Sequence, residues 1–324
     1  MTHRFLAVAL VLGIAATACA NEEKPEHRNA ENGEGEKKEA KEGEHERKDP
    51  PDLMLSNFFS AGWKDKFEEH PDEGRAPRFS LFQSRQGFLE RVAALKFTET
   101  HGLEKKTFDE NEPAAELEYA MNRRFELDVE AFNVTQVPQT LEGRSGDDTR
   151  FTLGLRFALI DTAWTAWSFE PRVTTRSPAL GEPQTELSFA VAGFQDLTRD
   201  GLYRTGLYET FEYVDRTGAL FAPGTPLPDE IPASRFFRTG LTVAKTWDSR
   251  DEHRPLAFTL FLEGLAVEQL DGTNRDRTAF TLTPGIRLSP LNDGRTWIQL
   301  GWEIPTSDFR TEDRRYLFAL LKDF

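Results

Sequence analysis

The sequence lacks most of what would indicate a disulfide-rich domain, a helical membrane protein or a nucleic-acid-binding protein. Its 324 residues include a single cysteine, Cys19, so no intrachain disulfide can form. Beyond residue 20, no run approaches the roughly 18 uncharged apolar residues of a membrane-spanning helix. The net charge of −15 argues against a nucleic-acid partner, because such partners are usually bound through basic patches.

Motifs of common catalytic sites are also missing. There is no G-x-S-x-G, no H-E-x-x-H and no phosphate-binding loop. His101 and His253 fall in loops that the strand pattern described below places at opposite ends of the fold. The acidic residues Asp248, Asp251 and Glu252 lack the spacing of a known calcium loop. The sequence therefore predicts no enzyme, no cofactor and no metal site.

The first twenty residues have the pattern of an export signal. A short basic start precedes an apolar run at 5–18, which is too short to span a membrane and ends in small residues. Cleavage after Ala18-Cys19-Ala20 would leave Asn21 as the new N-terminus. In the alternative, Cys19 is lipidated as the first residue of a lipoprotein, although Ala16 stands where such sites prefer Leu. We favour simple cleavage and keep lipidation of Cys19 as the alternative.

Charged residues dominate the segment that follows, 21–52. Residues 21–50 contain no Val, Ile, Leu, Phe, Trp, Tyr or Met. Such a segment cannot bury enough apolar surface to offset the entropy of ordering it, so we expect a disordered tether. A metal-binding tract built on His27, His45 and the glutamates is disfavoured by poor ligand spacing.

From residue 89 to the C-terminus the chain is a succession of strand-like segments. In the clearest, 151–159, Phe and Leu alternate with Thr, Gly, Arg and Ala. A strand of about ten residues is long enough to cross a membrane when it tilts by about 45°. Strands are expected at 89–100, 114–122, 124–134, 149–160, 164–174, 185–195, 202–213, 235–246, 255–268, 278–288, 295–304 and 314–324.

The connections between these segments alternate short and long. Asn122-Arg123 and 161–163 are tight, whereas 135–148 and 214–234 are long. A soluble sandwich has no reason to keep short and long links in phase, but outer-membrane barrels have short periplasmic turns and long external loops. Residues 89–324 are therefore predicted to form an all-β, transmembrane antiparallel up-and-down β-barrel of about 12 strands, within roughly 10–14, with both chain ends on the periplasmic side.

Two details qualify this prediction. Apolar residues in 53–67 repeat every three to four positions and predict a short amphipathic helix in the lead-in 53–88. It could lie on the membrane surface, but its acidic polar face favours a role plugging the barrel or packing beneath it. Pro171 and Pro284 fall inside proposed strands, where each removes a ladder hydrogen bond, so bulges or shifted strand ends are expected there.

Charged side chains alternate with the apolar set and are expected to face the lumen. Charges facing lipid would be costly, which supports the inward assignment. The predicted lumen-facing residues are Glu116, Glu118, Glu126, Asp128, Glu130, Arg156, Arg172, Arg204, Arg238 and Arg287. They would line either a water-filled channel or a narrow barrel packed with ion pairs. We favour a narrow, passive pathway for small polar or organic solutes; the alternative is a closed structural or adhesive barrel whose external loops bind a partner.

The end of the chain resembles the C-terminal signal of bacterial outer-membrane β-barrels. Tyr316, Phe318, Leu320 and terminal Phe324 match its alternating hydrophobic residues and final aromatic residue, and Lys322 departs from it. The resemblance implies a location in outer-membrane lipid and recognition by the barrel assembly machinery. Phe59-Ser60-Ala61-Gly62-Trp63 and Phe88-Leu89-Glu90-Arg91 also resemble the start of poorly characterised barrels described as putative transporters, without carrying any functional residue over.

Overall fold

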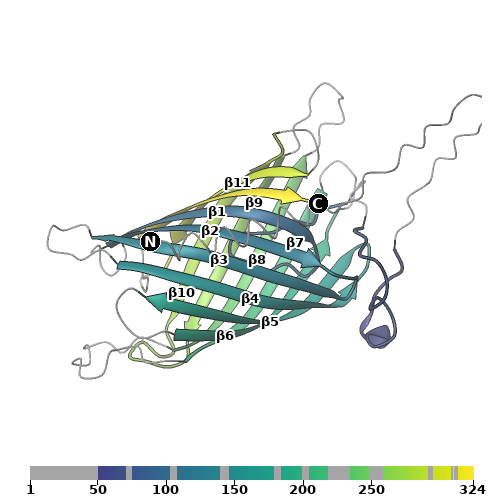
Figure 1. The fold of residues 1–324 in the computed structure, drawn as a ribbon. Helices are drawn as coiled ribbons and strands as arrows, with labels where there is room; N and C mark the ends of the chain where they lie inside the picture. Colours follow the sequence, from purple (N-terminus) through teal and green to yellow (C-terminus); the bar gives the residue numbers. More distant parts are fainter. Residues whose placement is uncertain are drawn as a thin grey trace, which may run out of the picture.

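The computed structural model describes residues 50–70, 75–102, 108–138, 146–178, 184–198, 204–217, 234–247, 258–290, 295–307, 309 and 313–324. Within them, twelve antiparallel strands form a closed barrel, each pairing with its sequence neighbours (Figure 1). β1 closes the ring on β12, from Val92 opposite Asp323 to His101 opposite Arg314. The predicted fold class is confirmed. The expected signal, with Cys19, and nearly all of the expected tether lie outside the described residues.

The strands run in sequence order around the barrel. Their bounds are β1 (Arg91–Gly102), β2 (Phe108–Ala120), β3 (Phe125–Pro138), β4 (Gly146–Asp161), β5 (Thr165–Pro178), β6 (Gln184–Asp196), β7 (Arg204–Thr217), β8 (Arg235–Trp247), β9 (Phe258–Gln269), β10 (Thr278–Leu288), β11 (Thr296–Pro305) and β12 (Arg314–Asp323). No helix in the described part of the chain is long and apolar enough to cross a membrane.

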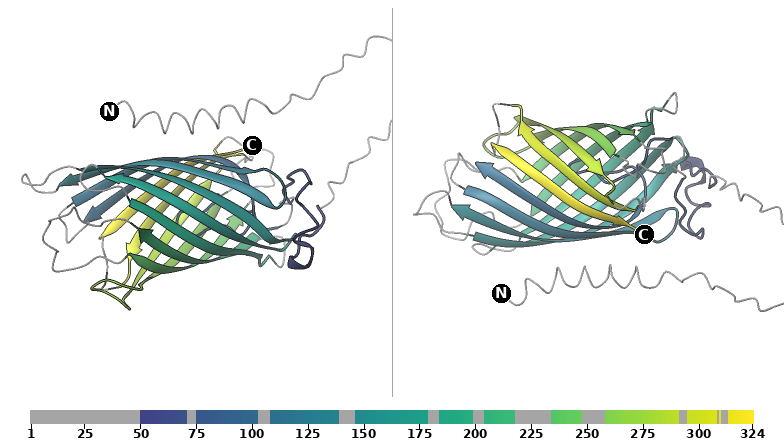
Figure 2. Two further views of the ribbon diagram at one scale, coloured as in Figure 1. Left: turned by 60° about the horizontal axis from the view of Figure 1, so that its bottom comes forward. Right: turned by 90° about the horizontal axis from the view of Figure 1, so that it is seen from above.

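Two-residue alternation divides each strand into an outer and an inner face. On β12, Tyr316, Phe318 and Leu320 are exposed, whereas Leu317 and Leu321 are buried. Figure 2 shows the tilted strands of the wall. Exposed Leu, Phe and Val side chains occur on most of the other strands as well. An apolar belt of this extent on a water-soluble protein would be an aggregation liability, and it fits contact with lipid.

The two ends of the barrel differ. The tight links Met121–Arg124 and Thr162–Trp164 lie at one end, which we name the turn end; the opposite end is the loop end. Several strands continue further toward the loop end than predicted: β2 begins at Phe108 instead of 114, and β3 ends at Pro138 instead of 134. The added residues are largely polar. Backbone pairing continues there without an apolar outer face, so alternation no longer marks the strand.

Three prolines lie inside strands without ending them. Pro171 pairs with Phe189 of β6, but pairing with β4 stops between the Gly154–Arg172 and Phe157–Phe169 pairs. Pro284 similarly pairs with β9 and interrupts pairing with β11, and Pro113 pairs with β1 and interrupts pairing with β3. Each missing N–H therefore opens one ladder and leaves the other intact. Neither change expected at Pro171 and Pro284, a bulge or a shifted strand end, is present there, because the pairs on either side of each interruption keep the same register.

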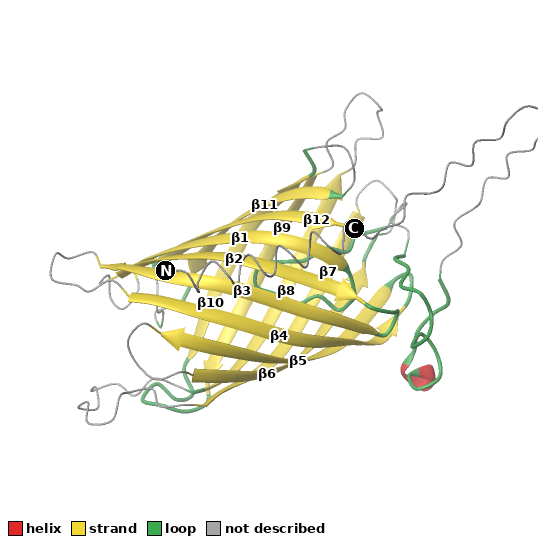
Figure 3. Ribbon diagram, viewed as in Figure 1, coloured by secondary structure: helices red, strands yellow, loops and turns green. Residues whose placement is uncertain are grey.

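The amphipathic helix predicted within 53–67 was also wrong. The only helical piece among the described residues is a single 3-10 turn, Leu55–Asn57 (Figure 3). Leu53 instead forms a β-bridge with Asp161, and Gly62 takes a positive φ of 85°. The buried Arg124 donates to the carbonyl oxygens of Met54 and Ala61. These contacts hold the segment at the turn end in an irregular path, which overrides its helical periodicity.

Candidate functional site

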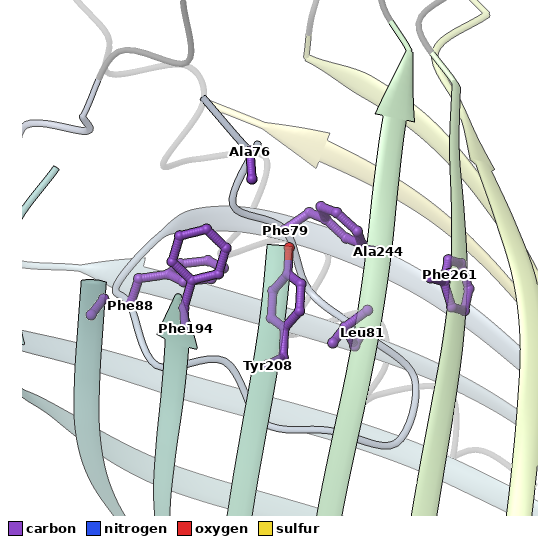
Figure 4. Packing of buried hydrophobic residues seen from close by; sticks show 9 residues of the cluster. Ala76, Phe79, Leu81, Phe88, Phe194, Tyr208, Ala244 and Phe261 are labelled. Carbon is purple, nitrogen blue, oxygen red and sulfur yellow. The ribbon is translucent and has the colours of Figure 1, made fainter. Parts of the chain in front are cut away.

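Residues 76–90, which we name the plug, enter the barrel lumen from the turn end. Phe79 and Phe88 pack in one buried cluster with Phe194 of β6 and Tyr208 of β7 (Figure 4). The Phe88 and Phe194 ring centroids lie 5.6 Å apart, and those of Phe79 and Tyr208 lie 5.5 Å apart. A plug or under-barrel role was expected for 53–67, but the segment that lies inside the lumen is 76–90.

Residues 82–85, which we name the plug tip, are held by polar side chains of the wall. The Glu263 carboxylate on β9 accepts hydrogen bonds from the backbone amides of Phe82, Gln83 and Ser84, at 3.0, 2.8 and 3.0 Å. On β7, Thr210 Oγ1 accepts a 2.9 Å hydrogen bond from the Arg85 amide. The buried amides of an irregular segment need acceptors, and these side chains supply them.

The plug approaches the wall most closely at Gly87. A Cβ added there would lie 2.6 Å from the Ala166 carbonyl oxygen and 2.7 to 2.8 Å from Gly193 backbone atoms. Because those atoms belong to paired strands, no side chain could move aside to make room. Glycine at this position therefore sets how closely the plug lies against β5 and β6.

Inward charges on β2 to β5 form a buried ion-pair network. Arg156 contacts three carboxylates: Glu126, Glu118 at 3.3 Å and Glu170 at 3.0 Å. Arg172 contacts Asp128 and also Glu170. All of these except Glu170 were predicted to face the lumen, and the structure brings them together from four neighbouring strands.

Lys96 of β1 extends the network. Its Nζ lies 2.5 Å from Glu116 and 3.8 Å from Glu130. One carboxylate oxygen each of Glu116, Glu118 and Asp128 lies within 4.8 Å of the others, an arrangement that a metal ion could bridge. Lys96, Arg156 and Arg172 already contact these carboxylates, so protein cations supply the counter-charge.

The network is packed and largely shielded from water. The Arg156 and Glu126 side chains are 0% exposed and Arg172 is 3% exposed. It is also joined to the plug: Gln86 donates to Glu118 at 2.6 Å, and the Glu90 amide donates to Glu126 at 2.6 Å. The sequence left open whether these charges line a water-filled channel or pack as ion pairs. Along β2 to β5 they pack as ion pairs.

The remaining predicted residues lie elsewhere on the inner face. Arg238 of β8 pairs with Glu212 of β7 at 3.2 Å. Arg287 of β10 is buried over the rings of Phe79 and Trp297. Arg204, the first residue of β7, is half-buried at the turn end. The ten residues thus do not form a single site.

The loop-end half of the lumen contains a cavity of about 210 Å³. Arg85, at the plug tip, lines it together with Arg172 and Arg238 of the wall. Hydroxyl side chains line it as well, among them Thr152 and Ser188. The lumen is therefore filled by the plug toward the turn end and hollow toward the loop end.

Several residues of this arrangement were missed by the sequence analysis. Glu170 bridges two arginines, and Glu263 anchors the plug. Both occupy inward positions of alternating strands, so strand parity alone could have found them. Gln86 and Glu90 lie in the plug, and no local pattern indicated that this segment enters the lumen.

No protein-family model matches the chain, and no curated protein sequence matches it. Solved structures match the fold at low sequence identity. The β domain of the Bordetella autotransporter BrkA matches with a TM-score of 0.52 and 8% identity, covering 73% of this chain and 100% of that domain. The fold is that of an outer-membrane β-barrel.

Two further barrels match with lower scores. LpxR from Salmonella typhimurium has a TM-score of 0.48 at 13% identity, covering 72% of this chain and 100% of its own. The COG4313 outer membrane channel from Pseudomonas putida F1 has a TM-score of 0.47 at 13% identity, covering 76% and 100%.

Proposed function

We propose that this barrel gives small polar solutes a narrow, passive pathway across the outer membrane, and that the plug is its gate. The observation that carries the proposal is the division of the lumen. A polar cavity occupies the loop-end half, and residues 76–90 close the turn-end half beneath it. A solute in this cavity would meet Arg85 of the plug tip, which lines it.

The way the plug is held supports a gating role. None of residues 76–90 belongs to a strand or a β-bridge. Residues 76–88 are attached through side chains such as Glu263 and Thr210, and among the described residues the one backbone hydrogen bond between plug and wall runs from the Ala120 amide to the Glu90 carbonyl oxygen. Displacing 76–88 would therefore leave the strand ladders paired. Each broken hydrogen bond would cost on the order of 1 kcal/mol, a scale that a bound solute or a partner can offset.

The proposal includes the route to the membrane. The N-terminal signal would export the chain, and the C-terminal strand would be recognised by the barrel assembly machinery. In support, Phe324 stacks on Tyr119 of β2 with ring centroids 6.2 Å apart, so the final aromatic residue is packed at the barrel seam. Short turns face the periplasm in outer-membrane barrels, so the turn end, from which the plug enters, would face the periplasm.

Single-channel recording of the purified full chain in planar bilayers tests the gate. Gly87→Ala forces a Cβ against the backbone of Ala166 and Gly193, so it should push the plug off the wall and raise open probability or conductance. Gly264→Ala is the matched control, because its Cβ would meet nothing nearer than 3.6 Å and should leave the current unchanged. Slower migration of boiled than of unheated protein in mild SDS would verify that each variant is a folded barrel.

A variant in which a short Gly/Ser linker replaces 76–88 tests whether the barrel conducts once the plug is removed. If it folds as a barrel and still conducts no current, the lumen is closed and the pathway proposal fails. The alternative of a structural or adhesive barrel would then stand. That alternative depends on the external loop 214–234, of which 218–233 lie outside the described residues.

A further inference from the structure

We propose that the loop-end cavity is a binding site for a small organic anion carrying two or more carboxylate or phosphate groups. This inference deepens the proposed function, on which it rests for the identification of that anion as the transported solute. Binding can nevertheless be measured without transport.

The charge of the cavity lining carries the inference. Six arginines come together from the plug and four strands, whereas only two carboxylates, Glu130 and Glu186, line the same space. A cavity with such an excess attracts anions and repels cations, and a guanidinium offers paired N–H groups that match carboxylate or phosphate oxygens. The arginines are Arg85, Arg150, Arg172, Arg176, Arg216 and Arg238.

Carboxylates around the cavity offset part of this excess. Glu212 lies 3.6 Å from Arg85 and 3.2 Å from Arg238, so this one carboxylate leaves its two arginines with a net charge of +1. Asp148 contacts both Arg150, at 3.0 Å, and Arg176, and Glu112 lies 3.5 Å from Arg150, so this second pair is balanced in charge. Because a guanidinium carries five N–H donors, each arginine also keeps donors that one shared oxygen does not use.

The position of these pairs favours an occupant with at least two anionic groups. One pair joins the plug to β8, and the other joins β4 to β5. One anionic group could accept hydrogen bonds from the unused donors of one arginine pair only. The cavity volume of about 210 Å³ lies below the roughly 300–1,000 Å³ of sites for drug-sized ligands, so the occupant is small.

Arg85 gives this site a connection to the gate. Its side chain pairs with Glu212 of the wall, and its backbone exchanges hydrogen bonds with Thr210. An anion that draws the Arg85 guanidinium away from Glu212 competes with one of the contacts that hold the plug tip. The proposed solute would thus act on the closure that it must pass.

Isothermal titration calorimetry of the full chain in detergent tests the site, with citrate as the anionic probe and glucose as a neutral one. We expect citrate to bind, with an affinity that falls as salt rises, and glucose not to bind. Arg176→Gln combined with Arg216→Gln should weaken citrate binding by tenfold or more. Both side chains are about one-third exposed near the cavity mouth, so their loss should leave folding intact; if the double variant does not fold, Arg216→Gln alone replaces it.

Arg235→Gln is the matched control. Arg235 also lies near the loop end, but it pairs with Asp271 at 3.1 Å and does not line the cavity, so citrate affinity should be unchanged. Equal binding of citrate by the wild type and the double variant, or no citrate binding at all, would overturn the site. Citrate binding by a barrel that never conducts would defeat the pathway and leave the site standing. Conductance without citrate binding would overturn the anion site and leave the pathway standing.

Discussion

The backbone amide of Ser84 donates a 3.0 Å hydrogen bond to Oε2 of Glu263, joining the plug tip to the middle of β9 across 179 residues of sequence. The amides of Phe82 and Gln83 donate to the same carboxylate. Glu263 is 1% exposed, so water cannot replace it as the acceptor. This one side chain therefore contributes more main-chain contacts to the plug tip than any other described wall residue.

Glu263→Ala should loosen the plug. It leaves three buried N–H groups without an acceptor, and a buried donor left unsatisfied costs about 1–3 kcal/mol. We expect a lower midpoint of urea unfolding and a larger or more frequent open current in planar bilayers. Glu268→Ala, which removes a carboxylate further along the same strand, is the control. Wild-type behaviour of Glu263→Ala in both measurements would exclude the anchoring role.

Arg156→Met should destabilise the barrel strongly. It removes the counter-charge of Glu118, Glu126 and Glu170, and breaking a buried ion pair by deleting one partner typically costs about 3–5 kcal/mol. Arg216→Gln, at a partly exposed pair with Glu186, should cost no more than about 1 kcal/mol. Equilibrium unfolding in urea compares the two variants. Equal, small losses would mean that the network is solvated.

Acid should weaken the contact between the β9–β10 link and the start of β8. Burial raises the pKa of Asp271, but hydrogen bonds from the Ser234 side chain and from the Arg235 and Ser234 amides outweigh it, and the pKa falls to about 2. A depressed carboxyl pKa stabilises the fold above the unfolded value, 3.8, and this contribution disappears as pH falls toward 2. Asp271→Asn should thus be less stable than the wild type at pH 6, with the difference in thermal midpoint shrinking between about pH 4 and pH 2. A difference that stays constant with pH would contradict this assignment.

Cys19 offers a test of how the chain is processed. Simple cleavage releases Asn21 and removes Cys19, so labelled fatty acid should enter neither the wild type nor Cys19→Ser. Mass spectrometry of the mature N-terminus provides the second measurement. Label in the wild type that is absent from Cys19→Ser would establish lipidation instead.

Part of this architecture could be predicted because it repeats locally. A side chain two positions along a strand returns to the same face, so Phe151 and Leu153 mark the outside and Arg156 the inside with no knowledge of neighbouring strands. The same parity places Glu126 and Asp128 in the lumen. Where the wall leaves the lipid, as at the start of β2, alternation weakens and the strand ends were predicted too short.

The filling of the lumen was decided by tertiary structure. Residues 53–67 carry a helical periodicity, yet Arg124 and Asp161 hold that segment in an irregular path, and the segment that enters the lumen is 76–90. Which acid meets which base, as for Arg156 and Glu170, likewise depends on the β4–β5 register. The sequence by itself determined the barrel, its inner and outer faces and its strand order, because these follow from a two-residue period and short links. Only the tertiary structure decided that the ion pairs are buried and that an arginine-lined cavity lies above a plug, because these depend on contacts between residues far apart in the chain.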